Sequence, residues 1–136
     1  MKISAKTRYG LRAMVLLAKN YQKKNFLSLR KISEEEGVSR DYLEKIMEKL
    51  KEKKLVRAKK GKEGGYVLAC SPEKIRVREI IKVLEKDSNL VFCLAKNKKV
   101  VCPKEKKCLS KKVWLKVQKA INSTLNSITL KDLIKL

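Results

Sequence analysis

The fold is decided by the stretch Ser28-Leu-Arg-Lys-Ile-Ser-Glu-Glu-Glu-Gly37-Val-Ser39-Arg-Asp-Tyr-Leu-Glu-Lys-Ile-Met-Glu-Lys-Leu50. Serine is a favoured helix cap, so Ser28 predicts a helix that runs to Glu36, and Ser39 predicts a second helix. Gly37 lets the chain turn between them. The apolar residues of the second helix recur at steps of three and four positions: Leu43, Ile46, Met47 and Leu50. The stretch therefore predicts two short helices joined by a tight turn, with one face of the second helix left for solvent.

A basic segment that contains glycine follows this pair of helices. It reads Leu55-Val-Arg-Ala-Lys-Lys-Gly-Lys-Glu-Gly-Gly-Tyr66-Val-Leu68. Its ends alternate between apolar and polar residues, and its middle holds glycine and lysine, which is the pattern of a β-hairpin with a basic tip. A helix-turn-helix followed by such a hairpin is a winged helix. We therefore expect a mainly α-helical fold with a small β-wing.

In a winged helix, the second helix enters a DNA major groove by its N-terminal turn, and the wing reaches phosphate or an adjacent minor groove. The outward face of the second helix begins with side chains that can both donate and accept hydrogen bonds, and the wing carries lysines. The candidate DNA-binding residues are Ser39, Arg40, Asp41, Glu44, Lys45, Lys59, Lys60 and Lys62.

The charge of the 136-residue chain agrees with a polyanionic partner. It has 36 Lys and Arg against 14 Asp and Glu, a net charge of +22, which makes binding to a polyanion strongly salt-dependent. A surplus of lysine is also typical of heat-adapted proteins, but there glutamate rises with lysine, and here it does not. Positions 1–33 hold nine basic side chains and no acidic one, so the charge is unevenly distributed.

The sequence lacks the features of an enzyme, a membrane protein or a secreted protein. It has no histidine, no serine in a nucleophile-elbow context and no glycine-rich phosphate loop. No apolar run approaches the length of a membrane span, and the first residues lack the apolar core of a secretory signal. We therefore expect a cytoplasmic protein that is not an enzyme and has no membrane partner.

The pattern divides the chain into four parts. A helix over 4–22 joins the two helices and the wing in a DNA-binding domain, 1–70. A linker helix occupies 71–89, and its apolar stripe consists of Val77, Ile80, Ile81 and Leu84. Positions 90–110 have neither helical nor strand periodicity and are predicted to be a loop. A long helix and a tail capped by Thr129 occupy 111–136.

The long C-terminal helix has an apolar stripe that nothing else in the chain is large enough to cover. The stripe consists of Val113, Trp114, Val117, Ile121, Leu125 and Ile128. Such a face is normally buried against another copy, so the pattern favours a homodimer in which this is the dimerisation helix. Packing onto the linker helix is the alternative, and the two are compatible.

The loop carries Cys93, Cys102 and Cys108, with six lysines between the first and the last. Neighbouring ammonium groups lower thiol pKa values and so favour the thiolate that binds metal. An iron-sulfur cluster tolerates irregular cysteine spacing, whereas structural zinc sites commonly use CxxC pairs. We therefore expect a metal site, with Glu105 or a group outside the loop as the fourth ligand. Cys70 is expected to be a packed residue.

Several blocks of the sequence occur together in a known family. They are the segment Met1–Met14, Ser39–Glu44, the Gly64-Gly-Tyr66 wing, Val77–Ile81, the three cysteines, the Trp-bearing helix and Ile128–Leu133. Over essentially its whole length the chain resembles the IscR/NsrR-type winged-helix transcriptional regulators of the Rrf-type family.

The resemblance implies a homodimer that binds palindromic double-stranded promoter DNA. It implies a 2Fe-2S or 4Fe-4S cluster on Cys93, Cys102 and Cys108, whose state tunes promoter affinity in response to iron-sulfur status, redox or nitric oxide. Bases would be faced by Arg40, Asp41, Glu44 and Lys45, and Lys60 would reach the minor groove. Three alternatives stay open: a regulator with a thiol switch between Cys102 and Cys108, a zinc-binding regulator, and a basic RNA-associated protein.

Overall fold

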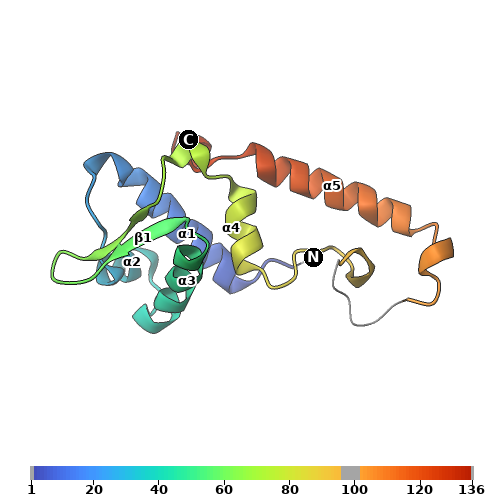
Figure 1. The fold of residues 1–136 in the computed structure, drawn as a ribbon, viewed down its shortest axis with the longest axis horizontal. Coiled ribbons are helices and arrows are strands. Elements are labelled where there is room, and N and C mark those ends of the chain that lie inside the picture. The colour runs from blue at the N-terminus through green and yellow to red at the C-terminus, as the bar shows by residue number, and fades with distance from the viewer. Residues whose placement is uncertain (1, 96–101, 136) are drawn as a thin grey trace.

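The computed structural model describes residues 2–95 and 102–135 (Figure 1). The α-helices are α1 (Ala5–Lys19), α2 (Leu29–Glu36), α3 (Arg40–Glu52), α4 (Val77–Leu84), α5 (Lys111–Ser127) and α6 (Leu130–Ile134). Strands β1 (Val56–Lys59) and β2 (Gly65–Leu68) form an antiparallel sheet. Short 3-10 turns occur at η1 (Tyr21–Lys23), η2 (Pro72–Lys74), η3 (Phe92–Leu94) and η4 (Glu105–Lys107). This confirms the predicted mainly α-helical winged-helix fold.

Serine residues begin the first three helices. The hydroxyl oxygens of Ser4, Ser28 and Ser39 accept hydrogen bonds from backbone N–H groups three residues later, at 3.2, 3.0 and 3.3 Å. Gly37 ends α2 with a φ of +65°, a left-handed conformation that suits glycine. The predicted caps at Ser28 and Ser39 are therefore present.

The first helix is shorter than the range 4–22 predicted for it. It ends at Lys19, and a separate 3-10 turn, Tyr21–Lys23, follows. Asn20 marks the break, because its side-chain amide donates hydrogen bonds to the backbone and side-chain oxygens of Asn25, at 3.3 and 2.9 Å. This side-chain bonding competes with helix continuation.

One hydrophobic core runs through the helix-turn-helix, the wing and both later helices α4 and α6. Its members with at most 1% of their surface exposed include Met14, Ile32, Leu43, Met47, Leu50, Leu68, Ile80 and Leu130. Helices α4 and α6 both pack against α1. The segment predicted as a linker helix and the end of the C-terminal tail therefore belong to the same packed body as the DNA-binding domain.

Two segments far apart in sequence meet where α5 joins this body. The Val77 N–H donates to the Ile128 carbonyl oxygen at 2.9 Å, and the Leu130 N–H donates to the Ile75 carbonyl oxygen at 3.0 Å. The Arg76 guanidinium also donates to the Asn126 carbonyl oxygen at 2.7 Å. These bonds fix the C-terminal end of α5 beside the start of α4.

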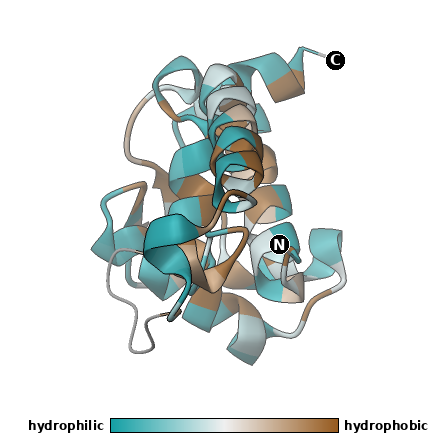
Figure 2. Cartoon of the chain, turned by 90° about the vertical axis from the view of Figure 1, so that its right-hand side faces the viewer, coloured by the Kyte–Doolittle hydropathy of each residue, from teal (hydrophilic) through white to brown (hydrophobic). Residues whose placement is uncertain are grey.

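Helix α5 projects from the body, and the cysteine-containing segment lies beside it at the far end of the molecule (Figure 1). Viewed from that end, hydrophobic and hydrophilic residues alternate around the helices (Figure 2). None of the helices in the described ranges combines the length and the apolar content that a bilayer span requires.

Candidate nucleic-acid interface and cysteine segment

Helix α3 presents its predicted reading residues to solvent. Its core face is fully covered, since Leu43, Ile46, Met47 and Leu50 are at most 1% exposed. The residues on the opposite face are exposed, namely Ser39, Arg40, Asp41, Glu44, Lys45, Glu48 and Lys49. The helix therefore offers side chains of both charges from a rigidly packed base, as a helix that enters a groove requires.

Tyr42 packs α3 against α1, and Tyr66 of the wing lies near two carboxylates of α3. The Tyr42 ring meets the ring of Tyr9 of α1 edge to face, with centroids 6.1 Å apart. Burial raises the pKa of Tyr66, and the negative charges of Glu48 and Glu44 raise it further. Tyr66 therefore lies close enough to Glu48 and Glu44 for their charges to affect it.

The wing is held to the body by its second strand. The Leu27 N–H donates to the Tyr66 carbonyl oxygen at 2.9 Å, and the Tyr66 N–H donates to the Leu27 carbonyl oxygen at 2.7 Å. Gly65 has a φ of +147°, and a Cβ there would lie 2.0 Å from the Leu27 carbonyl oxygen. A Cβ on Gly64 would lie 2.2 Å from the Lys59 carbonyl oxygen. Because Gly64 and Gly65 lack a Cβ, the backbone of the wing can approach Lys59 across the hairpin and Leu27 of the body.

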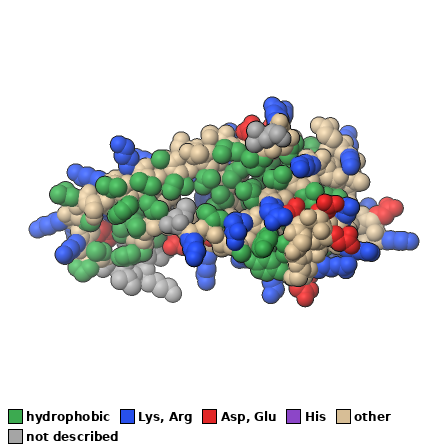
Figure 3. Space-filling model, turned by 180° about the vertical axis from the view of Figure 1, so that it is seen from behind, with side chains coloured by type: hydrophobic (Ala, Val, Ile, Leu, Met, Phe, Trp, Pro, Cys, Tyr) green, Lys and Arg blue, Asp and Glu red, His purple; other side chains and the backbone are tan. Residues whose placement is uncertain are grey.

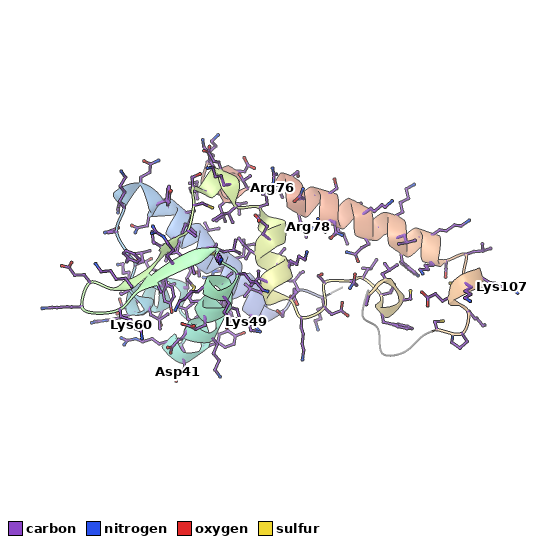
Figure 4. The ribbon with its side chains drawn as sticks, viewed as in Figure 1. Asp41, Lys49, Lys60, Arg76, Arg78 and Lys107 are labelled. Atoms are coloured by element: carbon purple, nitrogen blue, oxygen red, sulfur yellow. The ribbon has the colours of Figure 1, made fainter. Side chains whose placement is uncertain are left out.

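The three wing lysines are exposed, but they have different neighbours. The ammonium of Lys59 lies 5.9 Å from the centroid of the Phe26 ring, so it turns toward the segment that precedes α2. Lys60 and Lys62 lie at the exposed turn of the hairpin. Asp41 of α3 and Lys60 of the wing lie in the half of the molecule remote from Lys107 (Figure 4).

Lys6 of α1 and Lys49 of the exposed face of α3 form a basic pair. The pKa of Lys6 is lowered because its side chain is within hydrogen-bonding reach of Lys49 of α3, because it is partly buried, and because the two ammonium groups repel each other. The sequence pattern gave no sign of this pairing, since the contact joins residues 43 positions apart.

The N-terminus of α1 is also tied to the end of α4. The Ser4 N–H donates to Glu85 Oε1 at 2.6 Å. Burial raises the pKa of Glu85, but the hydrogen bonds from Ser4 and Thr7 and the charge of Lys6 outweigh it, so the pKa lies below its ordinary value. The carboxylate therefore stays ionised and holds α1 against α4.

The predicted metal ligands Cys93, Cys102 and Cys108 are all half-buried. Cys93 lies in the turn η3, whereas Cys102 and Cys108 flank η4. In the described ranges no three histidine, cysteine, aspartate or glutamate side chains gather as a metal site. Thiolates are the donors that hold iron-sulfur clusters, so the donor chemistry fits such a group, although the three sulfurs are not assembled here.

Cys108 and Glu105 each have polar partners of their own in this segment. A hydrogen bond with the Ser110 hydroxyl, at 3.1 Å, and one with the Lys111 backbone lower the pKa of Cys108, at the start of α5. Glu105, the nearest carboxylate to the cysteines in sequence, pairs with Lys111 at 3.1 Å. Cys70 packs against the core, as predicted.

Helix α5 leaves several large apolar side chains in solvent, three of which belong to the predicted stripe. Val113, Trp114, Leu115 and Val117 are 54, 40, 43 and 38% exposed. Hydrophobic side chains gather over this end of the molecule when it is seen from behind (Figure 3). Helix α5 also contacts α4, so the alternative packing on the linker helix is present at the same time as the exposed stripe.

Gln118 is the buried polar residue of α5, at 9% exposure. Its Oε1 accepts a hydrogen bond from the Leu90 N–H at 2.5 Å, and its Nε2 donates to the Ser88 carbonyl oxygen at 3.4 Å. Periodicity predicts which apolar residues of a helix are buried but gives no sign that a glutamine is buried to bind a loop.

A helix-turn-helix with an exposed second helix and a basic wing defines the class of winged-helix DNA-binding proteins. Residues 3–136 match the Rrf2 family, described as "Iron-dependent Transcriptional regulator". The chain belongs to the Rrf2 family of transcriptional regulators.

Named relatives support this assignment. The HTH-type transcriptional regulator CymR of Bacillus subtilis (strain 168) is 35% identical over 133 residues, which cover 98% of this chain and 89% of CymR. The solved structure of T. potens IscR matches with a TM-score of 0.77 and 37% identity, covering 99% of this chain and 87% of that one. The oxidized form of Staphylococcus aureus CymR matches with a TM-score of 0.78 and 34% identity, covering 100% and 98%. Such relatives are transcriptional regulators by name, which confirms the predicted non-enzymatic function.

Proposed function

We propose that this Rrf2-family regulator is a homodimer that reads palindromic promoter DNA with the N-terminal turn of α3 and the wing. The observation that carries the proposal is the exposed row Arg40, Asp41, Glu44 and Lys45 on a helix whose other face is fully packed. Arg40 and Lys45 suit guanine, and Glu44 suits the amino group of cytosine. Lys60 reaches the minor groove beside the site, and Lys59 and Lys62 add positive charge around the wing.

The exposed stripe of α5 supports the homodimer. Monomers rarely leave several large apolar side chains together in solvent, so a stripe that includes Val113, Trp114 and Val117 favours burial against a second α5. Two copies related by a two-fold axis would present two α3 helices to two half-sites, which is why a palindromic target follows from the dimer.

In this proposal Cys93, Cys102 and Cys108 hold a 2Fe-2S or 4Fe-4S cluster. The support is the thiol donor set, its lysine-rich surroundings and the description of the family as iron-dependent. When bound, the cluster supplies a group that responds to redox state or nitric oxide. The state of the cluster can change promoter affinity only if the segment before Cys93 contacts α5 differently with and without the cluster. The Leu90–Gln118 hydrogen bond joins that segment to α5, so it is the contact that would change.

A regulator with a thiol switch and no cluster is the second candidate. Hydrogen bonds from Ser110 and Lys111 favour the thiolate of Cys108. A related S. aureus CymR has a solved structure named as its oxidized form. In this version, hydrogen peroxide takes the two thiol hydrogens of Cys102 and Cys108 and is reduced to two molecules of water, and the two sulfurs form a disulfide.

Two measurements on the full chain, purified without oxygen, test the proposal. Selection of random duplexes should enrich an inverted repeat, and enrichment of no sequence would contradict the DNA-reading function. Visible absorption with iron, sulfide and zinc analysis should show a coloured protein that Cys102→Ala bleaches and the control Cys70→Ala does not. Colourless protein with reversible loss of free thiols would favour the thiol switch instead, and bound zinc would favour the zinc alternative.

A further inference from the structure

A basic groove lies between residues 24–28, the N-terminal turn of α2 and the face of the wing that carries Lys59. It consists of two cavities of about 650 and 320 Å³, which share Lys24 and Phe26 in their walls. We call it the wing groove. Ser28, Lys31 and Lys62 line its larger part, and Arg57 and Val67, which pair across the strands, line its smaller part.

The wing groove is strongly positive. Its walls carry five basic side chains, Lys24, Lys31, Arg57, Lys59 and Lys62, and one carboxylate, Glu63. Lys31 pairs with Glu35 at 3.3 Å, but both side chains are about half exposed, so the pair is weak. For Lys24, Arg57 and Lys62 the described ranges contain no carboxylate partner within ion-pair distance. The groove therefore attracts anions.

The geometry of the wing groove is fixed by the backbone. The two hydrogen bonds between Leu27 and Tyr66 hold residues 24–28 beside β2, and Gly65 allows this close approach. The ammonium of Lys59, 5.9 Å from the centre of the Phe26 ring, bridges the two sides. Ser28 caps the eight-residue helix α2 at the groove, where the positive end of the helix dipole adds to the field.

The wing groove is also continuous with the candidate DNA-binding surface. Lys59 and Lys62 belong both to the wing that approaches DNA and to the walls of the groove. The antiparallel pairing of Leu27 with Tyr66 places Ser28 toward the wing turn and Lys24 away from it. A chain of phosphates that passes the wing would therefore continue along the groove past Lys24 and Arg57.

The geometry points to a second, sequence-independent DNA contact: the wing groove binds backbone phosphates of the DNA that flanks each half-site, outside the bases read by α3. This inference rests on the proposed function, because it needs α3 and the wing on DNA. The DNA backbone is a regular polyanion, and the wing groove is a fixed concave surface with five cations and one carboxylate, so their charges are complementary. Contacts with phosphates position a protein on DNA without reading its sequence.

The test compares two duplexes that hold the same selected inverted repeat. One ends at the repeat, and the other extends it on each side by about 10 base pairs, one helical turn. The variant is Lys24→Asn/Arg57→Gln, because asparagine tolerates the left-handed φ of +53° at Lys24. The matched control is Lys74→Gln/Lys135→Gln, which removes two exposed charges on the η2 and α6 side.

Wild-type protein should bind the extended duplex more tightly than the short one. The groove variant should lose about tenfold in affinity for the extended duplex at moderate salt, with a salt slope shallower by about one for each lost phosphate contact, and change less than about twofold on the short duplex. The control should keep the wild-type preference for the extended duplex, with little change in its affinity for either duplex. If the groove variant lost affinity equally for both duplexes, or for neither, the inference would be overturned. No loss on either duplex would leave an acidic protein as the next occupant to test. Wild-type protein that prefers no repeat at all would instead refute the proposed function.

Discussion

The N–H of Leu90 donates a 2.5 Å hydrogen bond to Oε1 of Gln118, a residue 28 positions further along the chain. It ties the segment that leads to Cys93 to the middle of α5. The Gln118 amide also donates to the Ser88 carbonyl oxygen and to Asn122 Oδ1, at 3.4 and 3.3 Å. One side chain therefore connects the cysteine segment to the helix that carries the exposed apolar stripe.

Gln118→Leu should release this segment while preserving the apolar packing of α5. The half-buried Leu90 amide loses its acceptor, and about 1–3 kcal/mol, the cost of a fully buried unpaired group, is the upper bound for this loss. Hydrogen exchange should show faster exchange at residues 88–95, with little change in α3. Gln118→Glu is the matched control, because it retains an acceptor for Leu90. Unchanged exchange in Gln118→Leu would show that the hydrogen bond does not hold the segment.

Gly65→Ala should destabilise the protein more than a positive φ alone explains. The new Cβ would lie 2.0 Å from the Leu27 carbonyl oxygen, so the wing must move away from the body. Gly61→Ala is the matched control, since Gly61 has a φ of +107° but a Cβ there would meet no group of the described residues within 4 Å. We expect a loss of about 1 kcal/mol in unfolding free energy for Gly61→Ala and about 3 kcal/mol for Gly65→Ala. Denaturant unfolding measures both, and equal losses would contradict the close approach.

The local elements could be predicted because their signals are local. A serine cap such as Ser39, a turn glycine such as Gly37 and the spacing of Leu43 and Ile46 lie within one or two helical turns of one another. The same holds for the wing, where two glycines precede Tyr66. These signals fixed the helix-turn-helix, the hairpin and the exposed face of α3 without knowledge of the rest of the chain.

Contacts between distant segments could not be predicted in this way. The bonds of Val77 with Ile128 and of Leu130 with Ile75, the approach of Lys6 to Lys49 and the burial of Gln118 each depend on how separate elements dock. No pattern in either segment alone carries that information. The same is true of the wing groove, which depends on the pairing of Leu27 with Tyr66 of β2.

Glu44→Ala should relax sequence preference rather than simply weaken binding. A carboxylate at the groove accepts a hydrogen bond from cytosine and repels phosphate when the site is wrong. Competition against a panel of substituted promoter duplexes measures this. Lys60→Ala is the contrasting variant, because loss of a wing cation should lower affinity for all duplexes alike. Identical selectivity in Glu44→Ala and wild type would remove Glu44 from the base-reading set.

Glu85→Gln should destabilise the protein at neutral pH and lose this effect in acid. Because the folded-state pKa of Glu85 is depressed, its carboxylate contributes stability above its ordinary value of 4.5, and that stability disappears as the pH falls through the lower folded value. The difference in unfolding free energy between wild type and Glu85→Gln should therefore shrink below about pH 4.5. Glu52→Gln removes an exposed carboxylate of α3 and controls for net charge. A difference independent of pH would show that the charge of Glu85 is not what holds Ser4.

Trp114→Glu should convert the proposed dimer to a monomer. The side chain is 40% exposed in the single chain and lies in the apolar stripe of α5, so a buried carboxylate there would oppose association. Ser123→Glu adds the same charge on the opposite side of the helix and should leave the dimer intact. Light scattering after size exclusion measures the mass of each variant. Affinities for duplexes with one or two half-sites measure how the loss of the dimer changes DNA binding. The Trp114→Glu monomer should bind both duplexes with similar weak affinity, because it can no longer engage two half-sites at once. A Trp114→Glu dimer that still prefers the palindrome would place the dimer interface elsewhere.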